Sequence, residues 1–484
     1  MENQTKDRLF SAEPRHYIHL GISLVIAIFF RFLPPVGEIT AQGMAVLGVF
    51  IGVIYGFITV KNNPLVALMG ILMMGSTGFY PSPSASYYTA IGSAYVGMLV
   101  AIFAMIALMK DSGFLDWLTR SIVGWKIGRK SPWMLLILFI FAHYVVGAFA
   151  GWAVTYILWK LWKDVCTQMN WDKKTLRFGI ASLMLCCITV GQAWPICVNI
   201  ITLNGIWTAF SGLDAAPFLN YMGWATIVNW CIIAVWLLLG RFVFKVQMTS
   251  VSGFEVEKPG KLTAYQWYSA IALVVYFVVL IIAGLAKGWL TDLVNSFTMV
   301  GLAVLIVLIA CAIRPTGCKG RIEFFFAEAN WGILLTMAMI FLCTKSLSSP
   351  DNGIVATLGN ALGFMSNMHQ TAFLIVMTLL PLLVTQFMSN IATASMFIPV
   401  AFTIGSALGV NVYALNIAIY FLASTALGTP AGSGAAGIFF AQEDMDRNTA
   451  YKYGWIIAAI TWVVVLVIGV LLLGDVFFPR SLAG

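Results

Sequence analysis

The stretch that decides the fold is Gln386–Pro399, QFMSNIATASMFIP, which places Ser389 and Asn390 inside a long apolar region. Polar side chains at membrane depth find no partner in hydrocarbon, so they usually face a cavity or another helix. The apolar arms on either side are too short to cross a ~30 Å hydrocarbon core at about 1.5 Å per residue. We therefore predict a re-entrant hairpin over 369–406, and one or two ordinary spans with a polar packing spot are the alternative.

The composition indicates a helical membrane protein. Of 484 residues, 61% are hydrophobic and 10% are charged. The polar N-terminus precedes an apolar run that has no small-residue cleavage site, so we expect no removable signal peptide. The net charge of +8 is attributed to cytoplasmic loops and not to nucleic-acid binding.

The reactive side chains form no enzymatic or metal-binding pattern. The eight Cys include no C-x-x-C motif, and the four His share no ligand spacing, so no metal, resident cofactor or disulfide framework is predicted. The 19 Asp and Glu fall in loops or at span ends. A cation site at the midplane would therefore use carbonyls, hydroxyls and amides, which suits Na⁺ better than a proton relay. His143 is the one ionisable group near a predicted hairpin tip. We predict a protein that is not an enzyme.

Apolar runs of spanning length predict the topology. Two further regions, 131–166 and 369–406, are apolar on both arms with small or polar centres, and both are predicted to be re-entrant hairpins. The predicted fold is an all-α polytopic membrane protein with about 11 transmembrane helices and two opposed hairpins, the N-terminus inside and the C-terminus outside. The predicted spans are 17–33, 40–60, 63–80, 94–110, 176–204, 221–245, 264–286, 289–313, 329–345, 411–441 and 453–474.

The distribution of Lys and Arg favours this layout. Of the 27 Lys and Arg residues, 23 fall inside under this topology, as cytoplasmic loops require. Treating one hairpin as a full crossing would reverse every later loop and mix the charges. The first hairpin then opens from the cytoplasm and the second from outside. The four basic residues placed outside are Arg31, Lys287, Lys345 and Arg480.

Opposed hairpins suggest an inverted repeat, which is common in secondary transporters. An offset of 239 residues places Gln386 on Gly147. We expect a first repeat over 1–246, a cytoplasmic linker over 247–263 and a second repeat over 264–484. In each half the hairpin precedes a long span interrupted midway, 176–204 at Gly191–Pro195 and 411–441 at Gly428–Gly434, where Gly and Pro break the helix. Simple proline kinks are the alternative.

Two tips and two broken helices that reach the midplane from opposite sides would form one central site. Broken helices present N–H groups, which suit anions, and carbonyls, which suit cations. The polar candidates in the second half are Thr385, Ser389, Asn390, Thr393, Thr429 and Ser433, and those in the first half are Thr155, Thr189, Gln192 and Asn199.

Three motifs carry a family resemblance: SNIATA followed by a proline, the GTP break at 428–430, and FLPPVGEITAQGMAVLGVFIGVIYGFIT at 32–59. They resemble the divalent anion/Na⁺ symporter family of the solute carrier 13 type, within the ion-transporter superfamily. The resemblance implies a homodimer with a scaffold region and a mobile transport region that moves like an elevator. It also implies a Ser-Asn-Thr motif at each tip that contacts substrate carboxylates and helps to form two Na⁺ sites.

The second half keeps most of this pattern and the first half does not. Ile391 replaces the threonine of the second motif, and Ala150, Gly151 and Trp152 stand where the first motif is expected. The resemblance implies substrate contacts from Ser389, Asn390, Ile391, Thr429, Pro430, Gly151, Trp152 and Gln192. It implies Na⁺ contacts from Thr385, Met388, Asn390 and Gly428.

The altered first half leaves the substrate open. With Trp152 there, the substrate could be smaller, carry one anionic group, or present an apolar or aromatic part to the ring. Trp152 should loosen selection at that end, because apolar pockets discriminate weakly. Alternatively, Trp152 packs against lipid-side helices while Thr189 and Gln192 supply donors. We predict a secondary transporter of small anions, such as di- or tricarboxylates, that is coupled to Na⁺ and lies in a bacterial inner membrane. The alternatives are a Na⁺-independent anion exchanger, a monocarboxylate carrier, an anion sensor without transport, and a Na⁺/H⁺ or arsenite-type carrier, which the missing membrane carboxylates disfavour.

Overall fold

The computed structural model describes most of the chain, and the described residues form helices and loops without a strand. They divide into two compact units, which are treated separately below. The described residues are 14–60, 63–150, 152–190, 193, 198–248, 259–285, 301–302, 304–310, 312–313, 331–347, 349–361, 367–387, 390–430, 432–440 and 442–483.

The first unit combines the N-terminal helices with a later segment, Met1–Ser93, Ala209–Ser211 and Trp331–Gly363. Within it, α1 packs on α2, and α3 packs on α2, α4 and α15. Its elements are α1 (Pro14–Phe29), η1 (Phe30–Phe32), α2 (Ala41–Thr59), α3 (Asn63–Gly75), α4 (Pro83–Ile91), α15 (Trp331–Leu347), η4 (Pro350–Asn352) and α16 (Ile354–Ala361).

Long-range hydrogen bonds hold the two segments of this unit together. The N–H of Glu38 donates to Oγ1 of Thr357, 319 residues away, at 2.9 Å, and the N–H of Thr40 donates to the carbonyl of Asn352 at 3.1 Å. Gly353 has a φ of +65°, and a Cβ there would lie 1.7 Å from the carbonyl oxygen of Glu38. Only glycine allows these two segments of the chain to approach this closely.

The second unit contains both predicted hairpins and comprises Ala94–Thr208, Gly212–Asn330 and Phe364–Gly484. Its elements up to residue 285 are α5 (Ala94–Asp111), α6 (Phe114–Val123), η2 (Lys126–Lys130), α7 (Pro132–Ala150), α8 (Trp152–Gln168), α9 (Lys173–Val190), most of α10 (Val198–Ser211), α11 (Phe218–Leu238), η3 (Leu239–Val243) and α12 (Ala264–Leu285). Its later elements are α17 (Gln370–Thr385), α18 (Asn390–Ala407), α19 (Val412–Ala423), α20 (Gly434–Phe440), α21 (Arg447–Val464), η6 (Val465–Leu472), α22 (Gly474–Phe477) and η7 (Arg480–Ala483).

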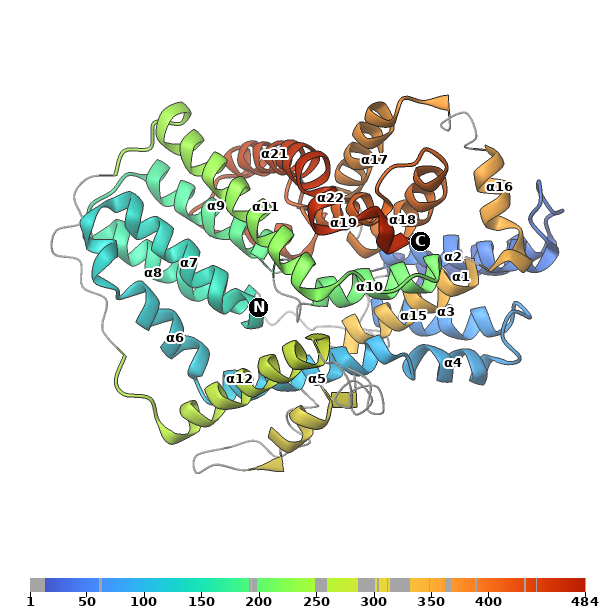
Figure 1. Ribbon diagram of the computed structural model, residues 1–484, viewed down its shortest axis with the longest axis horizontal. Coiled ribbons are helices and arrows are strands. Elements are labelled where there is room, and N and C mark those ends of the chain that lie inside the picture. Colours follow the sequence, from blue (N-terminus) through green and yellow to red (C-terminus); the bar gives the residue numbers. More distant parts are fainter. Residues whose placement is uncertain are drawn as a thin grey trace, which may run out of the picture. The chain divides into compact units, whose positions relative to one another are not determined.

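Two groups of helices in this unit correspond to the predicted hairpins. In the cyan-to-green part of the chain, α7 packs on α8 and α9, and in the orange-to-red part α17 packs on α18 and α19 (Figure 1). Ion pairs join α8 and α9 to the α20–α21 loop. Nζ of Lys163 lies 2.7 Å from Oδ2 of Asp444, and Nη1 of Arg177 lies 2.6 Å from Oδ2 of Asp446.

The long span predicted at 411–441 is interrupted, as its glycines and proline indicate. Helix α19 begins after Asn411, whose side chain accepts from the N–H of Ala414 at 3.0 Å. It ends at Ala423, and α20 begins at Gly434, and the described residues between them, 424–430, 432 and 433, are not helical. In the first half, α9 ends at Val190 and α10 begins at Val198, and most of the predicted break between them lies outside the described residues.

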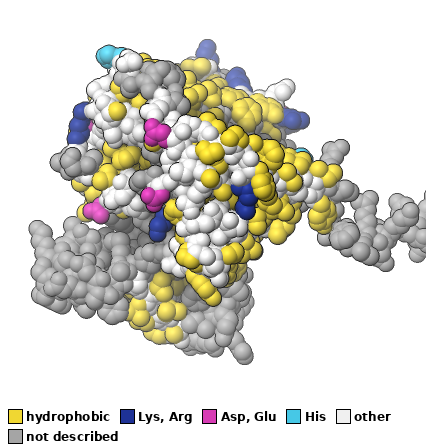
Figure 2. Space-filling model, turned by 90° about the vertical axis from the view of Figure 1, so that its right-hand side faces the viewer, with side chains coloured by type: hydrophobic (Ala, Val, Ile, Leu, Met, Phe, Trp, Pro, Cys, Tyr) yellow, Lys and Arg dark blue, Asp and Glu magenta, His cyan; other side chains and the backbone are white. Residues whose placement is uncertain are grey.

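The exterior is apolar. In the described part of the chain, Leu219–Val243 and Arg447–Leu472 are long and apolar enough to span a membrane, with mean hydropathies of 1.9 and 2.8. Shorter apolar helices include both arms of the second predicted hairpin, Gln370–Thr385 and Thr393–Ala407. The face in Figure 2 is largely hydrophobic or uncharged, with few and scattered charged side chains. Such a surface suits lipid, since soluble proteins rarely expose large contiguous apolar patches.

Candidate functional site

Three oxygen atoms converge where α17 ends. Oγ1 of Thr385, the last residue of α17, lies 3.1 Å from Oδ1 of Asn390, the first residue of α18. The same hydroxyl lies 2.5 Å from the carbonyl oxygen of Ala423, the last residue of α19. Thr385 is fully buried. Carbonyls of the last helical turn have no partner in their own helix, so this cluster can provide ligands to a hard cation.

The interruption between α19 and α20 lies directly against the end of α17. A Cβ at Gly432 would lie 3.2 Å from the carbonyl oxygens of both Thr385 and Gln386. The hydroxyl of Thr429 donates to the carbonyl of Gln386. Ser433 donates to the carbonyl of Ala426 at 2.8 Å and accepts from the N–H of Ala436 at 3.0 Å, so its hydroxyl caps α20. The tip and the break therefore form one hydrogen-bonded structure.

Gln386 is not among the site residues predicted from the sequence, although its side-chain amide makes three hydrogen bonds at this site. Oε1 accepts from the N–H of Gly428 at 2.6 Å, and Nε2 donates to the carbonyls of Leu382 at 2.8 Å and Thr425 at 3.2 Å. The side chain is fully buried. A polar residue directly after an apolar arm was the available signal, because a buried glutamine needs partners.

The remaining second-half candidates occupy different environments. Asn390 and Ile391 are half-buried at the start of α18, while Pro430 is exposed and Gly428 is buried. Thr393 is buried, and its hydroxyl has no hydrogen-bond partner among the described residues. Of the predicted cation ligands, Thr385 and Asn390 lie side by side, and the N–H of Gly428 donates to Gln386, the residue after Thr385. Met388 and Ser389, the other two predicted tip residues, lie outside the described residues.

The first-half candidates are described only in part. Gly151 and Gln192 lie outside the described residues, as do the side chains of Trp152 and Asn199. The side chain of Thr189 donates to the carbonyl of Leu185 within α9. Nε2 of His143 on α7 lies 2.8 Å from Oγ1 of Thr155 on α8, and both side chains are buried. This pair joins the two arms of the first predicted hairpin, so His143 is engaged with a neighbouring helix.

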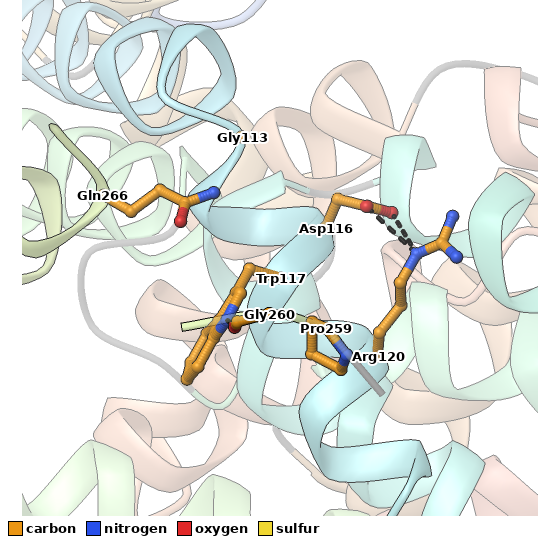
Figure 3. A pocket seen from close by; sticks show the side chains of 7 residues that line it. All are labelled: Gly113, Asp116, Trp117, Arg120, Pro259, Gly260 and Gln266. Atoms are coloured by element: carbon orange, nitrogen blue, oxygen red, sulfur yellow. Dashed lines mark hydrogen bonds and ion pairs between the residues drawn. The ribbon is translucent and has the colours of Figure 1, made fainter. Parts of the chain in front are cut away.

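A separate pocket of about 300 Å³ lies where the linker reaches α6. Figure 3 shows Trp117 against Gly260, whose carbonyl accepts from the indole N–H at 2.7 Å, and Asp116 facing Arg120 across an ion pair of 3.0 Å. The ion pair joins successive turns of α6 and is largely exposed, so it contributes little to stability. The hydrogen bond from Trp117 to the Gly260 carbonyl attaches the end of the predicted linker, 247–263, to α6. Among the described residues, no group of three or more His, Cys, Asp or Glu is placed to hold a metal ion.

These features define a class of protein, an all-α membrane protein with interrupted helices. Two solved transporters share the fold at 13% sequence identity. The YdaH transporter of Alcanivorax borkumensis has a TM-score of 0.60, covering 86% of this chain and 98% of that one. MtrF of Neisseria gonorrhoeae, described with a class of antimetabolite efflux pumps, has a TM-score of 0.56, covering 95% of each chain.

The family follows from the sequence match. The family model for citrate transporters matches residues 45–427, most of the chain, so the chain belongs to the citrate transporter family. It is 22% identical over 244 residues to the sodium-dependent dicarboxylate transporter SdcS of Staphylococcus saprophyticus, covering 48% of this chain and 46% of the relative. The chain thus matches about half the length of this curated relative. The family resemblance seen in the sequence is confirmed, and the chain belongs to a family of transporters and not of enzymes.

Proposed function

We propose that this protein is a secondary active transporter that carries a small organic anion of the di- or tricarboxylate class and is driven by Na⁺ bound at the second hairpin. Family membership supports an anion as the substrate. The match to a sodium-dependent dicarboxylate transporter supports the coupling ion and the substrate class. The substrate would bind beside the cation, where Asn390, Ile391 and Thr429 approach the tip.

The observation that carries the proposal is the oxygen cluster at Thr385. Oγ1 of Thr385 lies 3.1 Å from Oδ1 of Asn390 and 2.5 Å from the carbonyl oxygen of Ala423. Unwound backbone carbonyls next to broken helices coordinate Na⁺ in transporters with inverted repeats. In this arrangement the Thr385 hydroxyl proton would turn away from the cation, leaving a lone pair toward it.

The same site is absent from the first half. At the 239-residue offset, Val146 stands at the position of Thr385 and Gly151 at that of Asn390. Valine and glycine have no side-chain oxygen, so both side-chain ligands are lost. We infer that one Na⁺ accompanies each transport cycle, bound in the second half.

The overall mechanism is proposed from the same features. The short apolar arms of α17 and α18 and the interrupted span after them support two opposed re-entrant hairpins in an inverted repeat. One compact unit contains both predicted hairpins, and the other contains the N-terminal helices with α15 and α16. This division supports a homodimer in which each subunit has a scaffold unit and a transport unit, and in which the transport unit moves like an elevator. We place the protein in a bacterial inner membrane with the N-terminus inside.

The altered first motif favours a second candidate, anion exchange without Na⁺ or carriage of a monocarboxylate. Ala150 and Gly151 remove hydrogen-bond donors from that side of the site. A substrate with one carboxylate would need fewer donors, and exchange would need no coupling ion.

Counterflow in proteoliposomes tests these candidates. Purified protein is reconstituted with unlabelled mono-, di- or tricarboxylate inside, and uptake of each labelled anion is followed with Na⁺, K⁺ or choline outside. We expect uptake of a di- or tricarboxylate only with Na⁺. Equal uptake after replacement of Na⁺ would support Na⁺-independent exchange. Uptake of monocarboxylates alone would show that the substrate is a monocarboxylate and not a di- or tricarboxylate.

A further inference from the structure

Every polar atom of the Gln386 amide is used. A glutamine amide has two N–H donors and one carbonyl acceptor. Here Nε2 donates to the carbonyls of Leu382 and Thr425, and Oε1 accepts from the N–H of Gly428. The main-chain carbonyl of the same residue accepts from the hydroxyl of Thr429. The side chain is fully buried, so these bonds are not exchanged for bonds to bulk water.

These contacts join the end of α17 to the segment that follows α19. Leu382 belongs to α17, while Thr425 and Gly428 belong to the segment after α19. Thr425 is two residues from Ala423, whose carbonyl belongs to the proposed cation site. Gln386, the neighbour of Thr385, therefore bonds to the chain two residues away from the Ala423 carbonyl.

Close contacts at two glycines show that the segment after α19 is tightly packed against its neighbours. A Cβ at Gly428 would lie 2.8 Å from Oε1 of Gln386 and 3.0 Å from the ring of Trp455. A Cβ at Gly454, on α21, would lie 2.2 Å from the carbonyl of Leu427. The segment is held between α17 and α21, and the Gln386 amide supplies the directional bonds on the α17 side.

At the matching position of the first half, glycine has no side chain that could make this contact. Gly147 stands at the matching position, and a Cβ there would lie 2.5 Å from Nδ1 of His143. The ring of His143 occupies the space that a side chain at 147 would need. Both the proposed ligands and the residue that orients them are therefore confined to the second half.

We propose that Gln386 is a positioning residue for the coupling cation: its amide fixes the α19–α20 interruption against the end of α17 and thereby sets the affinity for Na⁺. This inference rests on the proposed function. Groups that orient metal ligands typically contribute about 10- to 100-fold to metal affinity. The amide bonds to three backbone groups of the protein, so substrate KM at saturating Na⁺ should stay within about twofold of wild type, a change of about 0.4 kcal/mol or less.

The test compares Gln386→Met, Gln386→Glu and the control Gln370→Met. Gln370 begins the same helix and is exposed, where it donates to the carbonyl of Leu408 at 2.7 Å. Methionine preserves side-chain length and removes all amide hydrogen bonds. A protonated glutamic acid keeps one donor and one acceptor. The measurements are the Na⁺ concentration for half-maximal uptake, the substrate KM at saturating Na⁺, and the increase in melting temperature that Na⁺ produces in detergent.

The expected order of half-saturating Na⁺ is wild type, then Gln386→Glu, then Gln386→Met at about 10- to 100-fold above wild type. Gln370→Met should match wild type. Na⁺-dependent wild-type uptake together with unchanged half-saturation in both Gln386 variants would overturn the positioning role. Wild-type uptake that ignores Na⁺ would instead overturn the proposed function. If Gln386→Met does not fold, the position of Gln386→Glu relative to wild type decides the question.

Discussion

The hydroxyl of Thr385, the last residue of α17, lies 3.1 Å from Oδ1 of Asn390, the first residue of α18. The two residues flank the tip of the predicted second hairpin and bring side-chain oxygens from both arms together. The carbonyl at the end of α19 completes the cluster. This small set of neutral oxygens is the cation site that we propose, and its three members include no carboxylate.

Thr385→Val tests this cluster directly. Valine keeps the shape of threonine and removes the hydroxyl, so we expect half-saturating Na⁺ to rise about tenfold or more. The control is Thr403→Val on α18, because the hydroxyl of Thr403 bonds only to the carbonyl of Pro399 in its own helix. The measurement is the initial rate of uptake over a Na⁺ titration. An equal effect of both variants would indicate a general loss of packing and contradict a specific ligand role.

Gly454→Ala should reduce stability because the added Cβ would lie 2.2 Å from the carbonyl oxygen of Leu427. Overpacking of this kind costs about 1–3 kcal/mol. Gly437→Ala, on α20, is the matched control, since its nearest contact is 3.8 Å away and alanine favours a helix by about 1 kcal/mol. Melting temperature in detergent should fall for the first variant and not for the second. A fall for Gly437→Ala alone would contradict the packing described around α21.

Trp152→Ala should widen or shift the range of anions carried. Trp152 stands where the family motif has a polar residue, and removing its bulk would leave room for a second carboxylate. The measurement is uptake of mono-, di- and tricarboxylates by the variant and wild type at saturating Na⁺. An unchanged substrate profile would show that Trp152 only packs between helices.

The stability of the loop before α21 should depend on pH through Asp446. Bonds from the N–H and hydroxyl of Thr449, and then the charge of Arg177, hold the pKa of the Asp446 carboxyl below its ordinary value of 3.8. Because the pKa is lowered in the folded state, the ionised carboxylate stabilises the fold at pH values above the ordinary pKa of 3.8. This stabilisation is lost as the pH falls through the lowered pKa of the folded state.

Asp446→Asn isolates this effect. Asparagine also caps helix N-termini well but does not titrate in this range. The melting temperature of wild type should fall more steeply than that of the variant as pH decreases from about 5 toward 3. Parallel curves for the two proteins would contradict a stabilising role for the ionised carboxylate.

Much of the fold could be predicted from local sequence, because helix-forming apolar runs and helix breakers act over short distances. The break after α19 followed from Gly428, Pro430 and Gly432, and the arms of the second hairpin followed from a polar pair between two short apolar runs. The range 369–406, predicted as a hairpin, covers α17 and all of α18 but its last residue, Ala407. The sequence also indicated Thr385 and Asn390 as members of one site, through the family resemblance.

The contacts of Gln386 could not be predicted in the same way. Its partner Gly428 lies 42 residues away, and no periodicity in the sequence indicates which buried N–H will meet its amide. The division into units was equally hidden, since one unit combines segments before residue 94 and after residue 330. Both depend on tertiary packing and not on local propensity.

The most direct test of the account is the Na⁺ dependence of uptake in proteoliposomes, measured as the initial rate for a labelled dicarboxylate over a Na⁺ titration. The proposed ligands come from Thr385, Asn390 and Ala423 in the second half, while Val146 and Gly151 at the matching first-half positions have no side-chain oxygen. With one such site, the rate should rise hyperbolically with Na⁺. Thr385→Val should shift that curve to higher Na⁺ without changing its shape. A wild-type rate that does not respond to Na⁺, or a sigmoidal response that requires two or more ions, would contradict a single coupling site in the second half.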